Sequence, residues 1–458
     1  MAIRSLRFSR LSMLIATRYS TSLRPRVPPQ AGCRYFLSDE NEVVFWSVIK
    51  LPGQERYSMR ATEADEGLYG RMRVTMLQPG ARHNYMQSRF LYAHGALRRL
   101  YTDFAMPDTP LARLVHGLVP KEGIRASLAR RVVKDVPGHL IRNIPSVRKQ
   151  NRIGRPAPWP IGRRDLSMSD IFYTQYYSGG HGLRDRIRPD AKIVSDVFTV
   201  PSTHKIVNAE VAAFPEWGEH PFDTSLCERY ERFTHDMLDD SDALFCPAQS
   251  VIDDIESYGA HHAGKCVLVP YASSLAFPAV PQPVPKRILF AGTLTLRKGP
   301  HYVKMAAERL ARTDPAFRFV FAGGVSDAAR RLLEGPNVEL LGHLSRDRMV
   351  EQFARADVFV LPSLAEGSAG VVLEAMSAAL PVVVSRGVGI DFPDGGPGFY
   401  VPDRDPDAIA AALVRICDDR PLREHMSREA LVRSSAYGLP AWDKRFMASL
   451  ARLCEGLE

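Results

Sequence analysis

The chain has 458 residues, 45% of them hydrophobic and 24% charged, which is typical of a soluble globular protein with two domains rather than one core. No run approaches the roughly 18 uninterrupted apolar residues of a membrane-spanning helix, which argues against an integral membrane protein. The six cysteines form no CxxC pair and no metal-like spacing, which predicts free thiols in a reducing compartment.

The N-terminal residues carry most of the net charge of +9. Residues 1–38 contain seven arginines and no acidic residue, so the rest of the chain has a net charge of only +2. A transit peptide has such a composition, and the alternative is a disordered leader or a start codon chosen too far upstream. We favour the latter explanations because Met72 opens a strong strand, MRVTMLQPG. Residues 1–71 are therefore expected to be a basic, disordered extension.

The first half, residues 72–276, alternates short β-rich runs with helical patterns, which is typical of parallel α/β layers. Its first strand, RVTMLQPG, is followed by a helix expected from Met86 to Arg99. Further strands are predicted at 100–104, 192–200, 242–248 and 265–272. Residues 105–170 are irregular, and we expect helical insertions there rather than core.

A second basic stretch runs from Arg113 to Arg155, with eleven lysines and arginines against two acidic residues. Interleaved apolar residues suit a helix lying on an anionic membrane surface. A solvated basic face, or a pocket for an anionic ligand, explains the stretch equally well. Nucleic acid is not expected as a partner, because no base-stacking or helix-turn-helix signature accompanies the charge.

Four prolines within residues 277–286 predict a stiff linker between two domains. Beyond it, strands are expected at 287–294, 317–324, 338–343, 356–363 and 380–386. Helices are expected at about 299–312, 326–334, 345–355, 370–379, 405–418 and 421–434. The strands are continuous apolar runs, typical of a sheet covered on both faces. We predict an α/β fold of two Rossmann-like domains facing a cleft, the second over 287–440, followed by a C-terminal helix over 441–458.

Ligands of such sheets bind at the carboxyl ends of the strands. The first loop of the second domain reads GTLTLRKG, from Gly292 to Gly299. Its glycines allow close approach of the backbone to a ligand. Arg297 and Lys298 place cations at a helix start, which the helix dipole disfavours unless a phosphate neutralises them. A solvated turn explains this loop as well.

A later loop, LPSLAEGSAGVVLEAM, contains two carboxylates. Helix amides starting near Gly370 would suit a diphosphate, and Glu374 could accept hydrogen bonds from the paired hydroxyls of a ribose. Glu366 lies in the loop itself, nearer such a ligand. The alternative is that neither residue binds a ligand. Glu366 would then be an ordinary acid at a helix start, and Glu374 a surface residue. The neighbours of Glu374 are almost all apolar, however, and a lone carboxylate there is costly without a partner.

The segment PSLAEGSAGVVLEAMSAALPVVVS resembles the donor domain of the family-4 retaining glycosyltransferases, bacterial proteins of the GT-B fold among them. The loop GTLTLRKG and the tail DGGPGFYVPDRDP resemble two further motifs of that family, in the same order. The likeness covers residues 286–435, about a third of the chain. The first half resembles acceptor domains of bacterial members more loosely, through PGARHNY and SDVFTVPSTHKIVNAEVAAFPEW.

The resemblance implies a retaining hexosyltransferase, as in polysaccharide biosynthesis. It would move a sugar from a nucleoside-diphosphate sugar to a hydroxyl of a glycan, lipid or small molecule, with acceptor contacts in 105–170. Lys298 would bind the diphosphate, Glu374 the ribose and Glu366 the donor sugar, while Gly323 and His343 would lie near the base. The implied donor site comprises Gly292, Thr293, Arg297, Lys298, Gly323, His343, Glu366, Gly367, Ser368, Ala369, Gly370 and Glu374.

The sequence departs from the family pattern at three places. Thr293 stands where the family usually has an arginine, and Arg297 is the candidate replacement. Ser368 and Ala369 replace a Phe-Gly pair, and Ala379 replaces a glycine. The first departure bears directly on how the diphosphate is held.

No metal and no cofactor is expected, because fixed cations would replace a divalent ion and no Asp-x-Asp motif ends a suitable strand. His83, after the first strand, is expected to face the cleft and stabilise charge on the sugar, unless it is only polar surface. Closure about the linker would exclude water.

Two other functions fit the same fold. One is a nucleotide-sugar epimerase, and the other is a catalytically weak interaction protein. A dehydrogenase is disfavoured because no GxGxxG follows a strand. A cytoplasmic location is expected, with residues 113–155 available for peripheral contact at the inner face of a membrane.

Overall fold

The computed structural model describes residues 69–110, 118, 122–145, 158–175, 181–272 and 281–455, and three strands nearer the N-terminus. These are β1 (Ile15–Tyr19), β2 (Cys33–Leu37) and β3 (Val43–Ser47), which pair antiparallel in the order β1-β3-β2. The expected extension 1–71 thus contributes strands. Its other residues up to 68, and residues 277–280 of the expected linker, lie outside the described residues. Among the described helices, none has the length and apolar character needed to span a membrane.

The first half folds into a seven-stranded parallel sheet in the order β12-β11-β10-β9-β4-β5-β8. Its strands are β4 (Val74–Leu77), β5 (Leu97–Thr102), β8 (Ile141–Asn143), β9 (Ile171–Gln175), β10 (Lys192–Asp196), β11 (Ala243–Cys246) and β12 (Cys266–Leu268). Its helices are α2 (Met86–Ala93), α4 (Glu122–Arg130), α6 (Arg163–Met168), α7 (Thr203–Ala213), α8 (Thr224–Asp240), α9 (Gln249–Glu256) and α10 (Ala260–Ala263).

Three sequence expectations for this half are corrected. The helix expected over 86–99 ends at Ala93, because Gly95 turns the chain with a φ of 72° and β5 begins at Leu97. Residues 105–170 are only partly helical insertion. They supply β8 at the sheet edge and the small sheet of β6 (Met106–Pro107) and β7 (Val132–Val133). Strand β9 was not predicted, although it lies beside β4 and is buried along its whole length.

The second half forms a six-stranded parallel sheet in the order β15-β14-β13-β16-β17-β18. Its strands are β13 (Arg287–Ala291), β14 (Arg318–Ala322), β15 (Val338–Gly342), β16 (Val358–Leu361), β17 (Val382–Val384) and β18 (Gly398–Tyr400). Its helices are α11 (Pro300–Thr313), α12 (Asp327–Leu333), α13 (Arg346–Arg355), α14 (Gly370–Ser377), α15 (Pro406–Asp418) and α16 (Arg420–Ser435). All five strands and six helices predicted here are confirmed, and β18 is additional.

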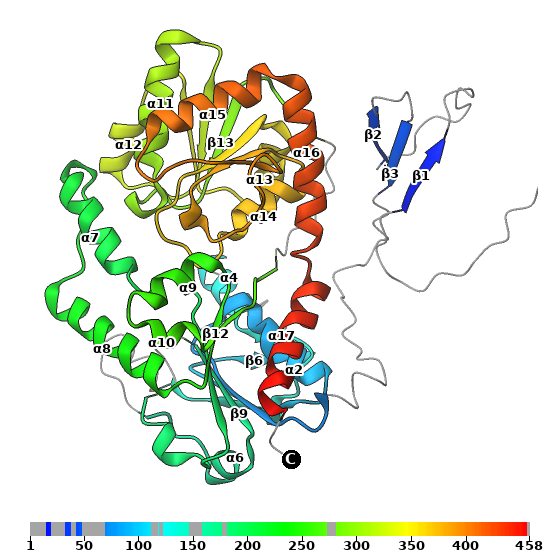
Figure 1. Cartoon of the computed structure of the whole chain (residues 1–458), viewed down its shortest axis with the longest axis vertical. Helices are drawn as coiled ribbons and strands as arrows, with labels where there is room; N and C mark the ends of the chain where they lie inside the picture. Colours follow the sequence, from blue (N-terminus) through cyan, green and yellow to red (C-terminus); the bar gives the residue numbers. More distant parts are fainter. Residues whose placement is uncertain are drawn as a thin grey trace, which may run out of the picture.

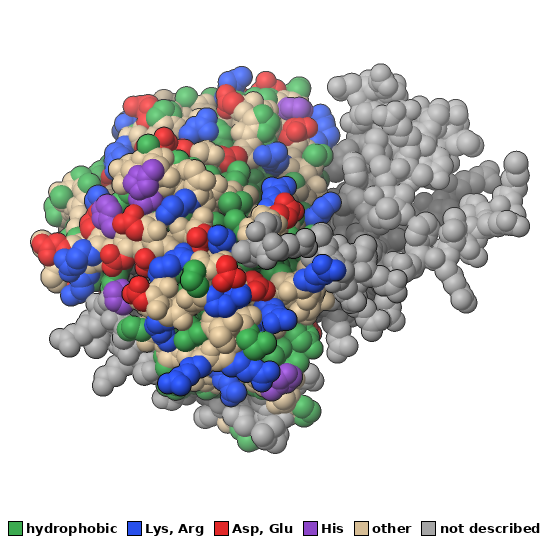
Figure 2. Space-filling model, turned by 60° about the horizontal axis from the view of Figure 1, so that its bottom comes forward, with side chains coloured by type: hydrophobic (Ala, Val, Ile, Leu, Met, Phe, Trp, Pro, Cys, Tyr) green, Lys and Arg blue, Asp and Glu red, His purple; other side chains and the backbone are tan. Residues whose placement is uncertain are grey.

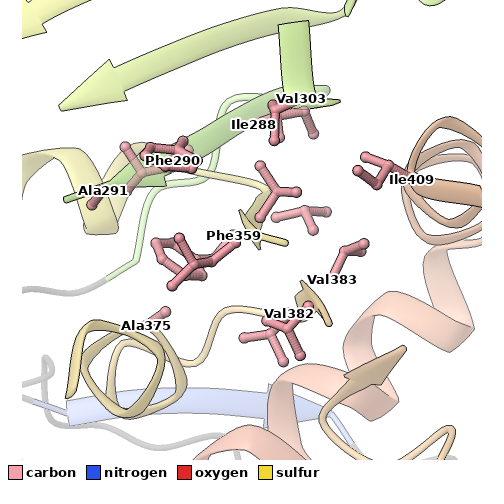
Figure 3. Close-up of a cluster of buried hydrophobic side chains, with 14 of the residues drawn as sticks. Ile288, Phe290, Ala291, Val303, Phe359, Ala375, Val382, Val383 and Ile409 are labelled. Carbon is pink, nitrogen blue, oxygen red and sulfur yellow. The ribbon is translucent and has the colours of Figure 1, made fainter. Parts of the chain in front are cut away.

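The core of the second half explains why its strands are continuous apolar runs. Figure 3 shows Ile288 and Phe290 of β13, Phe359 of β16 and Val383 of β17 meeting side chains of the helices on either side. All four strand residues are buried. Each such side chain contributes roughly 1.5–3 kcal/mol by leaving water. A sheet covered on both faces has no place for an alternating polar row, so its loops carry the polar chemistry.

The two halves exchange segments. Val211 of α7 and Trp217 of the following 3-10 turn (Pro215–Trp217) belong to the core of the second half. In the other direction, α17 (Leu439–Cys454) packs on α2 and buries Trp442 and Phe446 in the core of the first half. In Figure 1 the sheets lie one above the other along the long axis, and α16 leads into α17 down one side. The structural units therefore do not follow a simple division of the sequence at the linker.

Candidate active site

The order of the second sheet places two loops together. Strand β13 has β14 on one side and β16 on the other, so the connections after β13 and β16 leave the sheet in opposite directions. Ligands of open parallel sheets bind in the crevice at such a switch point. The loop after β13 contains Arg297 and Lys298, and the loop after β16 contains Glu366. The topology thus joins two motifs that lie almost 70 residues apart.

Glycines shape the first loop. Gly292 has a φ of 139°, and a Cβ there would lie 3.2 Å from Cδ of Lys298. A Cβ on Gly323, in the turn after β14, would collide with the carbonyl oxygen of Gly292. Because the two turns touch, both positions require glycine. The Lys298 side chain consequently lies over bare backbone.

Two cations meet one carboxylate oxygen at the centre of the site. Lys298 Nζ lies 2.7 Å and Arg297 Nη1 2.8 Å from Oε1 of Glu366. Ser363 Oγ donates to the same oxygen at 3.2 Å, and Arg297 also donates to the carbonyl of Ala365. The side chains of Lys298 and Glu366 are each 15% exposed. The Arg297 guanidinium therefore lies beside the Lys298 ammonium. A residue that replaces the family's arginine, which is absent at Thr293, would need this position.

The charges at this point favour an anion. Burial raises the pKa of Glu366, but the nearby charges and hydrogen bonds of Lys298 and Arg297 outweigh it and hold the pKa below its usual value. Glu366 is thus ionised at neutral pH. Two cations against one carboxylate leave one positive charge in a part-buried loop, where electrostatic interactions are stronger than in water.

The start of α14 adds open hydrogen-bond donors. Helix α14 begins at Gly370 without a side-chain cap, and among its first three amides Val372 N already donates to Ala369 O at 2.8 Å. The Ser368 hydroxyl is buried and has no partner among the described residues. Two amides of this loop are already engaged, because Glu366 N donates to Gly387 O and Ala369 N to Val388 O, both at 2.8 Å. The amide of Ala369, a residue of the implied donor site, is therefore not available to a ligand.

Glu374 lies one turn further along α14. Its side chain is half-buried, and within the described part of the chain no hydrogen bond or ion pair is recorded for its carboxylate. Burial raises its pKa to about 7, while the charge of Arg346 partly opposes that shift. Glu374 is thus a half-buried carboxylate on a helix whose other residues are mostly apolar.

The remaining donor-side candidates follow the neighbouring strands. Gly323 follows β14 and donates its amide to Gly342 O at 2.8 Å. His343 follows β15 and is exposed, as is Thr293 after β13. All three positions lie at the carboxyl edge of the sheet, where the sequence placed them. No contact recorded among the described residues joins His343 to Lys298 or Glu366.

Loops of the first half touch the second. A Cβ on Gly367 would collide with the carbonyl oxygen of Phe198, which follows β10. The Arg82 guanidinium carbon lies 3.5 Å above the Phe198 ring. Ala365 is buried in a core cluster of the first half, beside residues such as Val197. The two halves are therefore in contact beside Glu366, and Gly367 is the residue that permits the approach.

His83 is half-buried and packs against aromatic residues, one of them on α17. Its ring centroid lies 4.3 Å from that of Tyr271 and 5.2 Å from that of Trp442, and Nε2 is buried without a partner among the described residues. Burial and the charge of Arg82 lower its pKa to about 3, so the ring is neutral. The contact with Trp442 of α17 was not apparent from the sequence pattern.

Three polar residues that contact the candidate site or join the two halves were missed by sequence reasoning. Ser363 hydrogen-bonds Glu366. Glu219 accepts a hydrogen bond from Leu296 N at 2.6 Å, immediately before Arg297, and burial raises its pKa. Glu210 of α7 meets three residues of the second half: His301 Nε2 at 3.1 Å, Tyr302 Oη at 2.8 Å and Arg404 Nε at 2.6 Å. For Ser363 the position at a strand end was a usable signal. The two acids gave none, because their roles depend on α7 crossing between the halves.

Residues 285–419 match the family of glycosyl transferases group 1. An uncharacterized glycosyltransferase of Methanocaldococcus jannaschii is 32% identical over 166 residues, which are 34% of this chain and 42% of that protein. The D-inositol 3-phosphate glycosyltransferase of Corynebacterium diphtheriae is 26% identical over 296 residues, which are 58% of this chain and 67% of that protein. The chain thus spans less than half the length of the first of these relatives.

Solved structures show the same fold. Sucrose-phosphate synthase of Thermosynechococcus elongatus has a TM-score of 0.56 at 17% identity, covering 84% of this chain and all of that one. HepE of Anabaena, solved with UDP and glucose, has a TM-score of 0.52 at 15% identity, covering 83% of this chain and all of that one. Residues 285–419 therefore form a glycosyl transferases group 1 domain, in a chain that has the GT-B fold.

Proposed function

We propose that this chain is a glycosyltransferase that moves a hexose from a nucleoside-diphosphate sugar to an acceptor hydroxyl. The configuration at the anomeric carbon is retained. The observation that carries the proposal is the meeting of Lys298 and Arg297 at Glu366, beside the uncapped start of α14. A departing nucleoside diphosphate gains negative charge. Fixed cations and helix amides aimed at that charge lower the barrier.

Donor binding would exchange the partners of the two cations. Without donor, Glu366 neutralises part of the charge of Lys298 and Arg297. A diphosphate carries more negative charge than one carboxylate and would take over both cations. Glu366 would then be free to accept hydrogen bonds from hydroxyls of the donor sugar.

Glu374 completes the nucleotide site in this proposal. Two ribose hydroxyls can donate to its carboxylate, which has no ion-pair partner recorded among the described residues. Hydrogen bonds to the ionised form offset the cost of its burial. Gly323 and His343, at the ends of β14 and β15, would border the base.

Retention would follow from attack on the face from which the diphosphate leaves. The acceptor oxygen forms its bond to the anomeric carbon as the bond to the phosphate oxygen breaks, and the leaving phosphate takes the acceptor proton. No carboxylate nucleophile is needed, and Glu366 orients the sugar. Lys298 and Arg297 supply the charge stabilisation for which other enzymes use a divalent ion, which supports a metal-independent reaction.

A UDP-hexose is the first donor to test, since the HepE structure holds UDP and glucose. The acceptor we propose is a hydroxyl of a glycan, a lipid or a small molecule, as in polysaccharide biosynthesis. Its site would lie in the first half, whose Phe198 loop reaches Gly367.

Peripheral membrane contact is part of the proposal. Leu118 is 74% and Ile124 51% exposed, within the basic stretch 113–155. Exposed apolar side chains among arginines suit an anionic lipid surface. Co-sedimentation with phosphatidylserine vesicles, compared with phosphatidylcholine vesicles, checks this point. No binding to phosphatidylserine vesicles, or equal binding to both kinds of vesicle, would contradict it.

The decisive experiment combines donor binding with transfer. UDP-, GDP- and ADP-sugars are screened by thermal shift, with Glu374→Ala as test and Glu351→Ala, an exposed acid on α13, as matched control. We expect one nucleotide class to stabilise the parent and the control but not Glu374→Ala. If no nucleotide raises the Tm and Glu374→Ala behaves like the parent, the proposal is refuted.

A transfer assay separates the alternatives. Labelled donor is incubated with glycan and lipid extracts, and products are identified by mass spectrometry. A new nucleotide sugar formed without any extract would indicate an epimerase. Donor binding without any product would indicate an interaction protein.

A further inference from the structure

A cluster of histidine and aspartate lies outside the candidate active site. Asp239 is near the end of α8, and His261 and His262 form the middle of α10. One ligand atom from each of the three side chains lies within 4.8 Å of the other two. His262 is buried, whereas Asp239 and His261 are exposed, so the cluster opens to solvent on one side.

The distances suit ligands of one ion better than direct hydrogen bonds. His262 Nε2 lies 3.6 Å from Asp239 Oδ1, beyond hydrogen-bonding distance. Two ligands held at about 2.0–2.1 Å by a tetrahedral zinc ion are themselves about 3.3–3.4 Å apart. The three ligand atoms, which lie within 4.8 Å of one another, are thus near the separation that one ion requires.

Local backbone holds the two imidazoles together. The ring centroids of His261 and His262 are 3.8 Å apart. The His261 ring folds back over Gly259, where a Cβ would lie 2.8 Å from His261 Cε1. Gly259 has a φ of 151°, which other residues rarely adopt. Two imidazoles placed side by side can share one cation through their lone pairs.

The charges around the cluster set the expected strength. His235 lies one turn before Asp239 on the same face of α8 and close enough for its charge to act on His262, so it is a third imidazole beside the cluster. Lys265 donates to the carbonyls of Leu238 and Asp239 at 2.9 and 3.1 Å, which places a positive charge nearby. One carboxylate against this ammonium predicts micromolar rather than nanomolar affinity. Figure 2 shows histidine and acidic side chains side by side on the surface that it draws.

The topology separates this cluster from the candidate active site. Helix α8 ends just before β11 and α10 just before β12, so the cluster lies at the amino ends of these two parallel strands. The loops that meet at Glu366 lie at carboxyl ends of strands. An ion at the amino edge would join α8 to α10 without touching the donor.

We propose that Asp239, His261 and His262 bind one divalent transition-metal ion, with Zn²⁺ preferred, as a structural site at the amino edge of the first sheet. Imidazole nitrogens favour Zn²⁺ over Mg²⁺, and a mixed set of histidine and carboxylate suits tetrahedral zinc.

The test is titration of the tag-free, EDTA-treated full chain with Zn²⁺ by calorimetry. We expect one Zn²⁺ per chain at micromolar Kd, no measurable binding of Mg²⁺, and a rise in Tm of a few degrees at saturating Zn²⁺. His261→Ala and Asp239→Asn should each weaken binding at least tenfold. The matched control is His425→Ala, an exposed histidine on α16, which should bind Zn²⁺ like the parent.

Three results would overturn the proposal. They are the absence of binding below about 100 μM, equal affinity in parent and His261→Ala, and a loss of Zn²⁺ binding in His425→Ala that matches the cluster variants. Both cluster substitutions are at exposed side chains, and circular dichroism establishes that the variants fold. UDP-induced stabilisation should be the same with and without Zn²⁺. If chelation abolished it, the ion would belong to the donor site and a separate structural site would be disproved.

Discussion

The Glu219 carboxylate accepts a hydrogen bond from the Leu296 amide at 2.6 Å, so an acid from the first half holds the loop that carries Lys298. This contact lies directly before Arg297 and fixes the 3-10 turn from Leu296 to Lys298. The first half thereby helps to position the cations proposed to bind the diphosphate. The relationship has a measurable consequence.

Replacing Glu219 by alanine should weaken UDP binding about tenfold, because a charged acceptor is lost and the loop loosens. Glu219→Gln keeps an acceptor oxygen and should retain most of the affinity. Calorimetric titration with UDP compares the two variants. Equal affinity in Glu219→Ala and the parent would show that the contact does not position the loop.

Glu366→Gln should separate binding from transfer. Removing the carboxylate leaves Lys298 and Arg297 without their negative partner, so UDP should bind several-fold more tightly at low salt. Transfer should fall about a hundredfold, since the sugar loses its orienting carboxylate. Parallel loss of UDP affinity and transfer would contradict this exchange of partners.

Lys298→Ala should weaken UDP binding, in contrast to Glu366→Gln. The cation proposed to stabilise the leaving diphosphate is lost, so kcat/KM should fall about 10²–10³-fold and UDP affinity should also drop. Lys304→Ala on α11 removes a lysine of the same half that pairs with Glu308 and serves as control. Near-parental kcat/KM in Lys298→Ala would exclude this role.

The raised pKa of Glu374 predicts a pH effect on nucleotide binding. With a folded pKa of about 7, Glu374 is mostly protonated at pH 6 and mostly ionised at pH 8. Ribose hydroxyls donate to the ionised form, so UDP affinity should rise over this range in the parent. Glu374→Gln has no such group, and its affinity should change only through ionisation of UDP itself. Identical pH profiles for the two proteins would contradict the assignment.

The same residue predicts a pH effect on stability. Because the folded pKa lies above the unfolded value, the folded state binds more protons between about pH 4.5 and 7, and the free energy of unfolding falls as pH rises through that window. The loss reaches at most about 3 kcal/mol. Glu374→Gln should lack this loss, so denaturation at pH 5 and pH 8 distinguishes it from the parent.

The second half was predictable because its signals are local. Continuous apolar strands, glycine turns and helix starts all act over short distances, and Lys298, Glu366 and Glu374 follow strand ends that a reader of the sequence can locate. Sheet order then brings them together. The ion pair between Lys298 and Glu366 was not predictable, because the two residues are 68 positions apart and meet only through the packing of their loops.

The first half was harder to predict, because its elements and contacts depend on residues that are distant along the chain. Strand β9 follows an irregular stretch, and its neighbours in the sheet come from elsewhere in the chain. The His83 ring packs against Trp442, which lies more than 350 residues away along the chain. Glu210 and Glu219 look like surface acids in the sequence. Only the passage of α7 into the second half gives them partners.

The exchanged segments mean that neither half is complete alone. A fragment ending at the proline-rich linker would carry α7 and Trp217 without the core they fill, and would lack Trp442 and Phe446 of α17. The complementary fragment would keep α17 with nothing to cover. Each piece would expose a wide apolar surface, and the two should be recovered in native form only when produced together. Evolutionary shuffling of either half into another protein would face the same obstacle, so these halves are expected to be inherited as one unit.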